Sequence, residues 1–485
     1  MVLPASIVPA NEVALIDAAA EAMGLDIAEL MERAGTALAT EAESMAPEGP
    51  ILIATGPGNN GGDGLVAARV LADRGRTVWL WMLREPSSPL AQAQAQRLPA
   101  AVIRLEAAPE QPPVLIIDAI LGAGTSGPLR AWASQATAAL RAIAAPVLAA
   151  DCPTGIGGPD LLPSQRCLCF QVAKSELIDD PRVGEFKSVD IGIPPAAWQE
   201  LQPALMHRFP RHLPDGHKGQ HGELMVVGGG MFPGALHFAC RAGVISGCDL
   251  VRAWTAGDAW LPPSVIANRQ EGRWLAPTMP ERLTPMLVRA SAILIGPGLG
   301  REAGTPEATR QVFSLAQELE VPAVIDADGI THLAAELRDL PADAPPVILT
   351  PHGGEARTLL GHQADEEHLH RFARSNRIIL KKGRVDLITD GRRWQHNHRG
   401  NPRMAVGGTG DCLAGLAAGL LARGCDPFDA ARLATLWWTT TCDHLWQRQG
   451  PCWTPDQALD ALPDSLRDFL EPMGAWPPME QRPPA

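Results

Sequence analysis

The chain has 485 residues, of which 41 are Lys or Arg and 54 are Asp or Glu, giving a formal net charge of −13. Apolar residues make up 46%, enough for buried cores, whereas Gly 47 and Pro 45 are too few for a collagen or a disordered chain. The negative charge excludes a general binder of nucleic acid or of anionic membranes, because both require an excess of cations.

The termini and the cysteines favour an intracellular protein. The nine cysteines include no CxxC pair, which argues against a disulfide scaffold or a structural zinc site. The N-terminal stretch has neither early basic residues nor an apolar core, so no secretory signal is expected. The longest helical apolar run, 412–422, is shorter than the ~20 residues that span a bilayer. We expect a cytoplasmic protein without a membrane or nucleic-acid partner.

The first half of the chain shows the pattern of a parallel sheet. Helical periodicity over 11–23 and 27–44 is followed by short apolar runs that alternate with helical segments. Because such runs are typical of strands buried on both faces, they predict a sheet with helices on each side. The expected strands are 51–54, 78–83, 114–120 and 146–150.

A segment rich in Pro, Gly, His and Arg at 202–222 predicts a domain boundary. A second, different series of strands and helices follows it. Its expected strands are 223–227, 292–295, 323–325, 347–349 and 377–380. We therefore expect an α/β protein of two domains, 1–208 and 214–470, with a frayed Pro-rich tail at 471–485.

A glycine-rich segment, TGPGNNGGDG at 55–64, lies between the first expected strand and the next helix. Ligands bind at this edge of an open α/β sheet, and free N–H groups at a helix start attract phosphates. A flexible turn is the alternative, but glycines combined with Asn-Asn and Asp at such a junction favour binding. The spacing matches neither GxGxxG nor the Walker lysine loop.

Two further expected strands end in acids, Asp118 and Asp151, each followed by Gly or Pro. Either one alone could be a capping or turn aspartate. Three polar, glycine-rich strand ends together point to one shared site. Because Asn, Asp and Thr offer hard oxygen donors, a bound hard cation is reasonable there.

The motifs LMERAG, GNNGGDGLVAARVL, IDAILGAGTSG and DCPTG make residues 5–200 resemble the NAD(P)HX epimerase family. The resemblance implies a K⁺ ion held by Asn60, Asp118 and Thr154. It also implies that Asp151 does acid–base work at the nicotinamide ring, with Lys174 as a weaker candidate. Contacts to the dinucleotide are implied at Asn59, Gly61, Gly62, Asp63, Gly122, Gly124, Gly127 and Asp151. Cys152 replaces an aliphatic residue of the family, and Thr154 replaces Ser.

A second constellation, VGGTGDCLAG at 406–415, opens an apolar helix. The N–H groups of that helix start form an anion hole, and Asp411 lies in the first turn. Phosphoryl transfer needs such a hole together with a carboxylate that takes the acceptor's proton. Helix capping is the alternative role for Asp411.

The Gly-Thr-Gly-Asp turn resembles the ribokinase-like superfamily. Motifs such as HKG, GPGLG and TPHGGE narrow the resemblance, over about 215–460, to NAD(P)HX dehydratases. The hydrated dinucleotide is implied to contact Ala235, Gly298, His352 and Asp411, and the adenine nucleotide Lys382, Gly383, Asp386 and Gly410. Gly329, Thr331 and Asp386 depart from the family pattern. An acid at 386 is unfavourable beside a phosphate, so we expect its side chain to point away or the nucleotide preference to be altered.

As a whole, the chain resembles bifunctional NAD(P)H-hydrate repair enzymes. This implies that a Rossmann-like N-terminal domain epimerises R- and S-NAD(P)HX and that a ribokinase-like C-terminal domain dehydrates the S form with ADP (or ATP). Mg²⁺ and K⁺ are implied as cofactors, and a homo-oligomer is expected. Two alternatives remain: a ribokinase-like kinase for a vitamin precursor, and a dinucleotide-binding scaffold with one inactive half.

Overall fold

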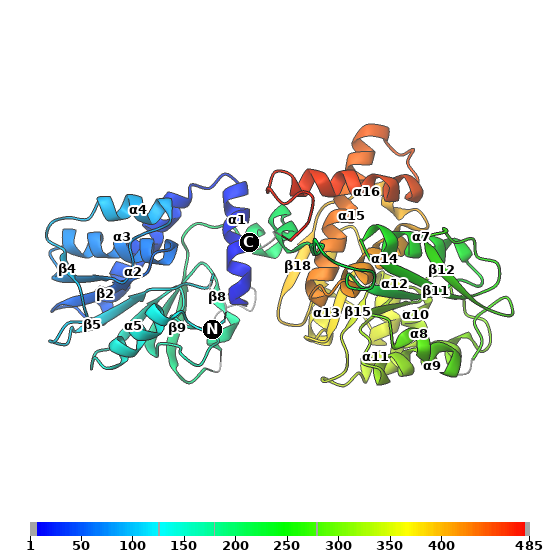
Figure 1. Ribbon diagram of the computed structural model, residues 1–485, viewed down its shortest axis with the longest axis horizontal. Coiled ribbons are helices and arrows are strands. Elements are labelled where there is room, and N and C mark those ends of the chain that lie inside the picture. The colour runs from blue at the N-terminus through cyan, green and yellow to red at the C-terminus, as the bar shows by residue number, and fades with distance from the viewer. Residues whose placement is uncertain (1–6, 125–126, 179, 278–279, 481–485) are drawn as a thin grey trace. The chain divides into compact units, whose positions relative to one another are not determined.

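The computed structural model describes residues 7–124, 127–178, 180–277 and 280–480. They form two compact units, unit 1 ending at Ala197 and unit 2 beginning at Trp198 (Figure 1). The boundary thus lies before the Pro-rich segment, at the short helix α6 (Ala196–Gln199), and not at the expected 208–214. In the described part of the chain, no helix is long and apolar enough to cross a membrane.

Unit 1 contains a seven-stranded sheet whose neighbouring strands are all parallel. In spatial order the strands are β4 (Ile103–Leu105), β3 (Val78–Met82), β2 (Ile51–Thr55), β5 (Leu115–Ala119), β6 (Val147–Ala150), β7 (Ser164–Phe170) and β9 (Val183–Val189). The four predicted strands are confirmed as the apolar strands β2, β3, β5 and β6. The other three lie toward the two edges of the sheet and were not predicted.

Helices cover both faces of this sheet (Figure 1). One face packs against α2 (Ile27–Met45) and α3 (Asn59–Asp73), with α4 (Pro89–Gln96) packed on α3, and the other face packs against α5 (Ala131–Arg141). Both faces of the central strands are therefore removed from water, which explains why the runs are apolar throughout.

A two-stranded parallel sheet joins the N-terminal segment to the rest of unit 1. It pairs β1 (Ile7–Val8) with β8 (Ala173–Lys174), the latter followed by the 3₁₀ turn η3 (Ser175–Leu177). After β1 come the 3₁₀ turn η2 (Ala10–Glu12) and helix α1 (Val13–Ala22).

Unit 2 contains a nine-stranded sheet that is parallel from β12 to β16 and antiparallel at β17 and β18. In spatial order its strands are β12 (Val265–Gln270), β11 (Leu250–Ala256), β10 (Glu223–Val227), β13 (Ala292–Ile295), β14 (Ala323–Ile325), β15 (Val347–Leu349), β16 (Arg377–Lys381), β17 (Asp386–Thr389) and β18 (Trp394–Asn397). The five predicted strands are confirmed as the contiguous set β10, β13, β14, β15 and β16. Strands β11, β12, β17 and β18 at the two sides were not predicted.

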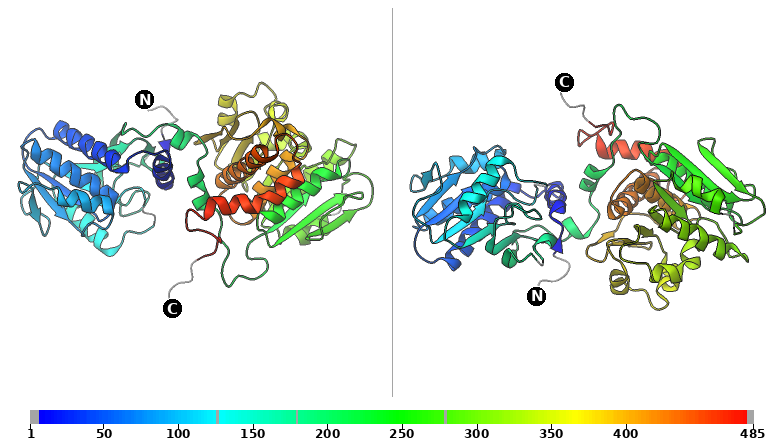
Figure 2. Two further views of the ribbon diagram at one scale, coloured as in Figure 1. Left: turned by 90° about the horizontal axis from the view of Figure 1, so that it is seen from above. Right: turned by 60° about the horizontal axis from the view of Figure 1, so that its bottom comes forward.

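Two helical layers sandwich the unit-2 sheet. One layer, green, orange and red in Figure 2, comprises α7 (Pro233–Ile245), α14 (Thr409–Ala422), α15 (Pro427–Gln449) and α16 (Pro455–Leu470). The opposite layer comprises α8 (Pro280–Leu287), α9 (Thr305–Glu318), α10 (Asp328–His332), α11 (Ala334–Arg338), α12 (Gly353–Leu360) and α13 (Glu366–Phe372). A 3₁₀ turn, η5 (Pro402–Ala405), leads into α14.

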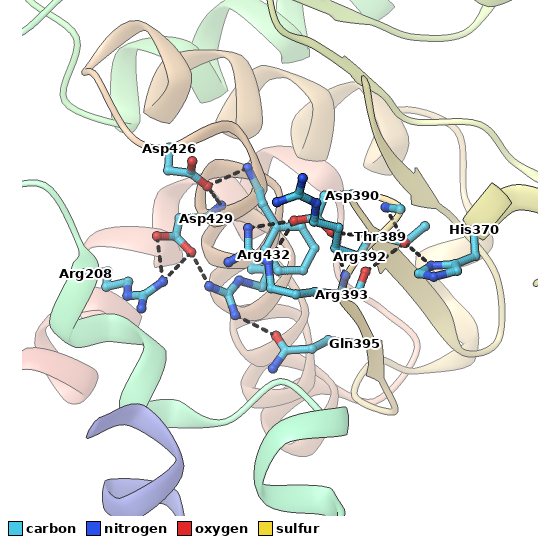
Figure 3. Close-up of polar contacts among 12 residues, drawn as sticks. Arg208, His370, Thr389, Asp390, Arg392, Arg393, Gln395, Asp426, Asp429 and Arg432 are labelled. Atoms are coloured by element: carbon cyan, nitrogen blue, oxygen red, sulfur yellow. Dashed lines mark hydrogen bonds and ion pairs between the residues drawn. The ribbon is translucent and has the colours of Figure 1, made fainter. Parts of the chain in front are cut away.

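A polar network explains why residues from Trp198 onward belong to unit 2. Arg208, at the end of the 3₁₀ turn η4 (Pro203–Arg208), donates to both carboxylate oxygens of Asp429 at 3.0 Å. Asp429 also pairs with the buried Arg432 of α15, which donates to Gln395 of β18 at 3.1 Å (Figure 3). Gln395 in turn donates to the Trp198 carbonyl at 3.0 Å.

The C-terminal tail differs from the expected frayed segment. Its residues up to 480 are placed against unit 2, where the N–H of His212 donates to the Pro478 carbonyl at 2.8 Å. The N–H of Glu480 donates back to the His212 carbonyl at 3.0 Å, and Ala475 is buried. Residues 481–485 of the expected tail lie outside the described residues.

We expect Asp429→Ala to lower the free energy of unfolding of unit 2 by about 3–5 kcal/mol, because the buried Arg432 guanidinium loses its carboxylate. Asp464→Ala is the control, since Asp464 pairs with Arg467 on the surface and such pairs contribute about 0–1 kcal/mol. Urea-induced unfolding followed by circular dichroism measures both changes. Equal losses in the two variants would contradict the role given to Asp429.

Candidate active sites

The carboxyl ends of the unit-1 strands surround a cavity of about 500 Å³. Most of the residues expected to bind there do line it: Asn59, Asn60, Asp63, Gly122, Gly124 and Asp151. Gly61, Gly62 and Gly127 are not among the lining residues that the structure describes. A Cβ on Gly61 would lie 2.0 Å from the Gly56 carbonyl oxygen, so this glycine allows α3 to start close to the sheet.

Asp151 is the most constrained carboxylate of the cavity. It follows β6 with φ at 63°, a left-handed backbone that non-glycine residues seldom adopt. Its carboxylate accepts from the Phe170 N–H at 3.1 Å and contacts the Nζ of Lys174. The neighbouring Cys152 is fully buried, and burial raises the pKa of its thiol, which fits a packing role.

Lys174 has no exposed surface, and its Nζ also donates to the Val172 carbonyl at 3.1 Å. Burial alone would lower the pKa of Lys174, but the adjacent Asp151 carboxylate and buried thiols raise it above its ordinary value. Lys174 therefore stays charged and orients the Asp151 carboxylate. The weaker of the two acid–base candidates is thus the buried counter-ion of the stronger one.

The three residues expected to hold a cation lie around the segment Leu121–Gly122. Thr154 donates to Asp118 from its N–H at 2.8 Å and from Oγ1 at 2.7 Å, and it accepts from the Leu121 N–H at 3.1 Å. The Asn60 side chain lies against Gly122, and its Oδ1 and Nδ2 are buried without a hydrogen-bond partner.

Asp118 is the one ionisable side chain among these three residues. Burial raises the pKa of Asp118, although hydrogen bonds from Thr154 and Ile120 oppose the shift. Among the described residues there is no group of three or more His, Cys, Asp or Glu side chains suited to a metal ion. A cation here would therefore need amide and hydroxyl oxygens besides the Asp118 carboxylate.

One lining residue, Asp17 of α1, was missed in the sequence. It stands on the same helix face as Val13 and Ile16, which also line the cavity. A carboxylate within an otherwise apolar helix face was the signal that could have found it.

The second constellation lies at the start of α14, in unit 2. Asp411 is in the first turn of this helix, which begins after Gly408. The Lys382 Nζ lies close by: a Cβ on Gly410 would be 3.3 Å from it. Lys382 pairs with the buried Asp326 carboxylate at 2.7 Å, and Thr350 Oγ1 donates to the same carboxylate oxygen at 2.7 Å.

These charges set the protonation of Asp411. Burial, and next the Asp326 carboxylate, raise the pKa of Asp411 to about 7, although Lys382 opposes the shift. Burial alone would lower the pKa of Lys382, but the carboxylates of Asp326, Glu355 and Asp411 together raise it. Asp411 can therefore gain or lose a proton near neutral pH, beside a permanently charged ammonium.

The structure brings together most of the other residues expected in unit 2. A Cβ on Gly298 would lie 3.1 Å from the Ala235 Cβ, so these two residues are neighbours. His352 and Lys382 are paired in an isolated parallel bridge. The His352 side chain also caps α12, where its Nδ1 accepts from the Gly354 N–H at 2.9 Å.

Asp386 is directed into the protein, as expected for an acid near a phosphate site. Its carboxylate accepts from the Gly383 N–H and from Asn397 Nδ2, both at 3.0 Å. Burial raises the pKa of Asp386, and these two hydrogen bonds oppose the shift.

The roles of Asp326 and Thr350 were not predicted, although both directly follow expected strands. Gly329 departs from the family pattern for a steric reason: a Cβ at this position would lie 2.7 Å from the Ile295 carbonyl oxygen. Nothing in the structure explains the departure at Thr331.

Comparisons with known proteins cover both units. Residues 27–174 match a family model described as YjeF-related protein N-terminus, and residues 224–464 match one described as NAD(P)H-hydrate dehydratase. The bifunctional NAD(P)H-hydrate repair enzyme of Hyperthermus butylicus is 34% identical, over 95% of this chain and 92% of its own. That of Pyrobaculum aerophilum is 35% identical, over 87% of this chain and 90% of its own.

Solved structures resemble the second half of the chain. A ribokinase-like superfamily protein from Enterococcus faecalis is 24% identical, with a TM-score of 0.50, and the match covers 56% of this chain and 96% of that one. The ADP/ATP-dependent NAD(P)H-hydrate dehydratase of Bacillus subtilis, co-crystallized with ATP/Mg²⁺, is also 24% identical, with a TM-score of 0.47 over 56% of this chain and 99% of that one. The ribokinase-like fold expected for the second domain is confirmed.

We expect the wild-type chain to lose more stability between pH 5 and pH 8 than Asp411→Asn, by roughly 1–3 kcal/mol. The pKa of Asp411 rises from its ordinary 3.8 to about 7 on folding. The neutral Asp411 carboxyl therefore makes its full contribution to the stability of the folded state below about pH 4. This contribution is lost as the pH rises through 7. Urea unfolding at both pH values measures the difference, and equal losses in the two proteins would contradict the raised pKa.

Proposed function

The chain belongs to the family of bifunctional NAD(P)H-hydrate repair enzymes, and we propose how its two units divide the work. It epimerises the R and S hydrates of NADH and NADPH and dehydrates the S hydrate at the expense of ADP. We assign epimerisation to unit 1, which ends at Ala197, and dehydration to unit 2, which begins at Trp198. The similarity to full-length relatives over 95% of the chain carries this conclusion.

In unit 1, the hydrated nicotinamide ring would occupy the cavity beside Asp151. The dinucleotide phosphates would lie at the start of α3, where the first N–H groups of a helix have no partner within it. The proposed contacts are Asn59, Gly61, Gly62, Asp63, Gly122, Gly124, Gly127 and Asp151. Lys174 would hold the Asp151 carboxylate in place while Asp151 moves a proton at the substrate hydroxyl.

K⁺ is proposed at Asn60, Asp118 and Thr154. These residues fit the ion, because the buried Asn60 Oδ1 has no hydrogen-bond partner and Asp118 supplies a buried carboxylate. When bound, the ion would neutralise the Asp118 charge and provide a positive centre near the phosphates. It would also fix the strand ends after β2, β5 and β6 that carry the three ligands.

In unit 2, Asp411 would take the proton of the ring hydroxyl as this group is phosphorylated, and loss of phosphate would then restore the dihydronicotinamide. A carboxylate with a pKa of about 7 suits such proton transfer near neutral pH. The hydrate would contact Ala235, Gly298, His352 and Asp411. The adenine nucleotide would contact Lys382, Gly383, Asp386 and Gly410.

ADP (or ATP) would enter unit 2 with Mg²⁺ bound to its phosphate oxygens, as is common at sites that handle nucleotide phosphates. The Lys382 ammonium and the first N–H groups of α14 supply the positive side of the site.

Cytoplasmic localisation and a homo-oligomeric state are further proposals. Cell fractionation would test the first, and light scattering the second.

The test of the two assignments uses an equilibrated mixture of R- and S-NADHX with ADP, Mg²⁺ and K⁺, following the return of dihydronicotinamide absorbance. Asp411→Asn should slow dehydration by about 10²–10⁴-fold and leave epimerisation intact. Asp151→Asn should give fast recovery of the S portion only, because the R hydrate is no longer converted. Normal recovery in both variants would contradict the assignments, and failure of the wild type with either nucleotide would favour the kinase or scaffold alternatives.

The proposed cation site predicts that K⁺ stabilises unit 1 and that Asn60→Ala removes the effect. Replacing K⁺ with tetramethylammonium at constant ionic strength should lower the Tm of wild-type unit 1 but not that of the variant, because the large organic cation cannot replace a bare ion. Thermal unfolding in the two salts measures this without any substrate. An equal K⁺ effect in wild type and variant would place the ion elsewhere.

A further inference from the structure

The unit-1 cavity contains a carboxylate that the proposed contacts leave unused, Asp17. The face of α1 toward the cavity carries Val13, Ile16 and Asp17, which have the i, i+3, i+4 spacing of one helix side. Asp17 opens onto the space of the cavity, so its carboxyl stays accessible to water although protein surrounds it on most sides. The next acid of the helix, Glu21, is exposed and does not line the cavity.

The position of Asp17 is tied to that of the Asp151–Lys174 pair. The strand before α1 pairs with β8 so that Val8 lies opposite Lys174, the residue that contacts Asp151. The N–H of Ala10 then donates to both carboxylate oxygens of Glu176 at 3.0 Å, which fixes the start of the helix. One short strand thus places both carboxylates at the same cavity.

Burial and the charges of the cavity raise the pKa of two of its carboxyls, those of Asp17 and Asp63. Burial, and next the charge of Asp151, raise the pKa of Asp17 to about 6, although Lys174 opposes the shift. Asp63 of α3 also lies at the cavity, and burial together with the charges of Asp151 and Asp17 raises its pKa well above the ordinary value. One ammonium, that of Lys174, thus faces three carboxyls, and its only direct ion pair among the described residues is with Asp151.

The reaction proposed for this cavity needs two groups that exchange a proton. The R and S hydrates differ at the ring carbon that bears the hydroxyl. One route to inversion is for the hydroxyl to leave and to return on the other side. A carboxyl must protonate the departing oxygen, and a carboxylate must take a proton from the water that adds.

We propose that Asp17 is the second acid–base residue of the epimerisation site and works together with Asp151 on the substrate hydroxyl. This inference rests on the proposed function of unit 1. Asp63 suits the task less well, because it lies near the start of α3 and is already a proposed contact of the dinucleotide. Asp17 lies on another element and opens onto the cavity.

The proposed step is balanced in atoms and charge. A proton passes from Asp17 to the hydroxyl oxygen, the carbon–oxygen bond breaks to release water, and the ring nitrogen's electron pair forms a carbon–nitrogen double bond. Water then adds to the other side of that carbon, electrons return to nitrogen, and the water's extra proton passes to Asp151. Transfer of that proton back to Asp17 through cavity water resets the site, and the reverse direction uses the same two groups with their roles exchanged.

The experiment measures conversion of purified R-NADHX to S-NADHX by chromatography, using the full chain with K⁺ but without ADP, so that dehydration does not occur. We expect Asp17→Asn to lower kcat by about 10²-fold or more with little change in KM. The wild-type kcat should fall as the pH rises through about 6, where Asp17 loses its proton. This descending limb of the pH profile should be absent from Asp17→Asn. Asp17→Glu should retain activity with a shifted limb, and Glu21→Gln, the control on the same helix, should match wild type.

Asp151→Asn separates failure of this inference from failure of the proposed function. If Asp151→Asn loses epimerisation while Asp17→Asn keeps the wild-type kcat and pH profile, the role of Asp17 is wrong and the site assignment stands. If neither variant changes the rate, the assignment of epimerisation to this cavity fails as well. Should Asp17→Asn fail to fold, Asp17→Glu decides: a shifted pH limb supports acid–base action, and an unchanged profile overturns it.

Discussion

A Cβ atom on Gly56 would lie 1.9 Å from the carbonyl oxygen of Ile120, and one on Gly296 would lie 1.8 Å from that of Asp326. Each glycine directly follows a strand, β2 or β13, and each carbonyl directly follows the neighbouring strand. No other residue allows the two backbones to come so close. In unit 1 the chain can therefore turn into α3 directly at the sheet edge, where the phosphate site is proposed. In unit 2 the same close approach fixes the end of β14, where Asp326 lies.

The two units share a further arrangement: a buried or partly buried lysine pairs with one carboxylate while another carboxyl lies nearby. In unit 1 the pair is Lys174 with Asp151, and in unit 2 it is Lys382 with Asp326. Burying an ammonium is tolerable only when it is paired, so the first carboxylate is committed to it. The remaining carboxyls, Asp17 and Asp411, are largely surrounded by protein and repelled by a neighbouring carboxylate, and both have a pKa raised toward neutrality. The two carboxyls to which we assign proton transfer thus stand in the same charge arrangement on two different sheets.

The strands and residues that could be predicted are those whose pattern lies within one short stretch of the sequence. Strands buried on both faces, such as β2 and β13, are continuous apolar runs and were found, whereas the partly exposed edge strand β12 carries Asn268 and Arg269 and was not. Asp118, Asp151 and Asp411 could be proposed from the sequence because each lies at the end of an expected strand or the start of an expected helix. Asp17 was missed because its position depends on the pairing of β1 with β8, which joins residues far apart in the chain.

Asp386 shows how a residue that looks unfavourable for nucleotide binding fits the site. Asn397 and Asp386 lie opposite each other in the β17–β18 hairpin, so the amide donates to the carboxylate and draws it inward. The same carboxylate accepts the Gly383 N–H, a donor that a phosphate could otherwise use. This leaves the Lys382 ammonium and the first N–H groups of α14 as the proposed phosphate donors of unit 2. Both lie beside Asp411, so the charge proposed to bind the nucleotide also acts on the proposed proton acceptor.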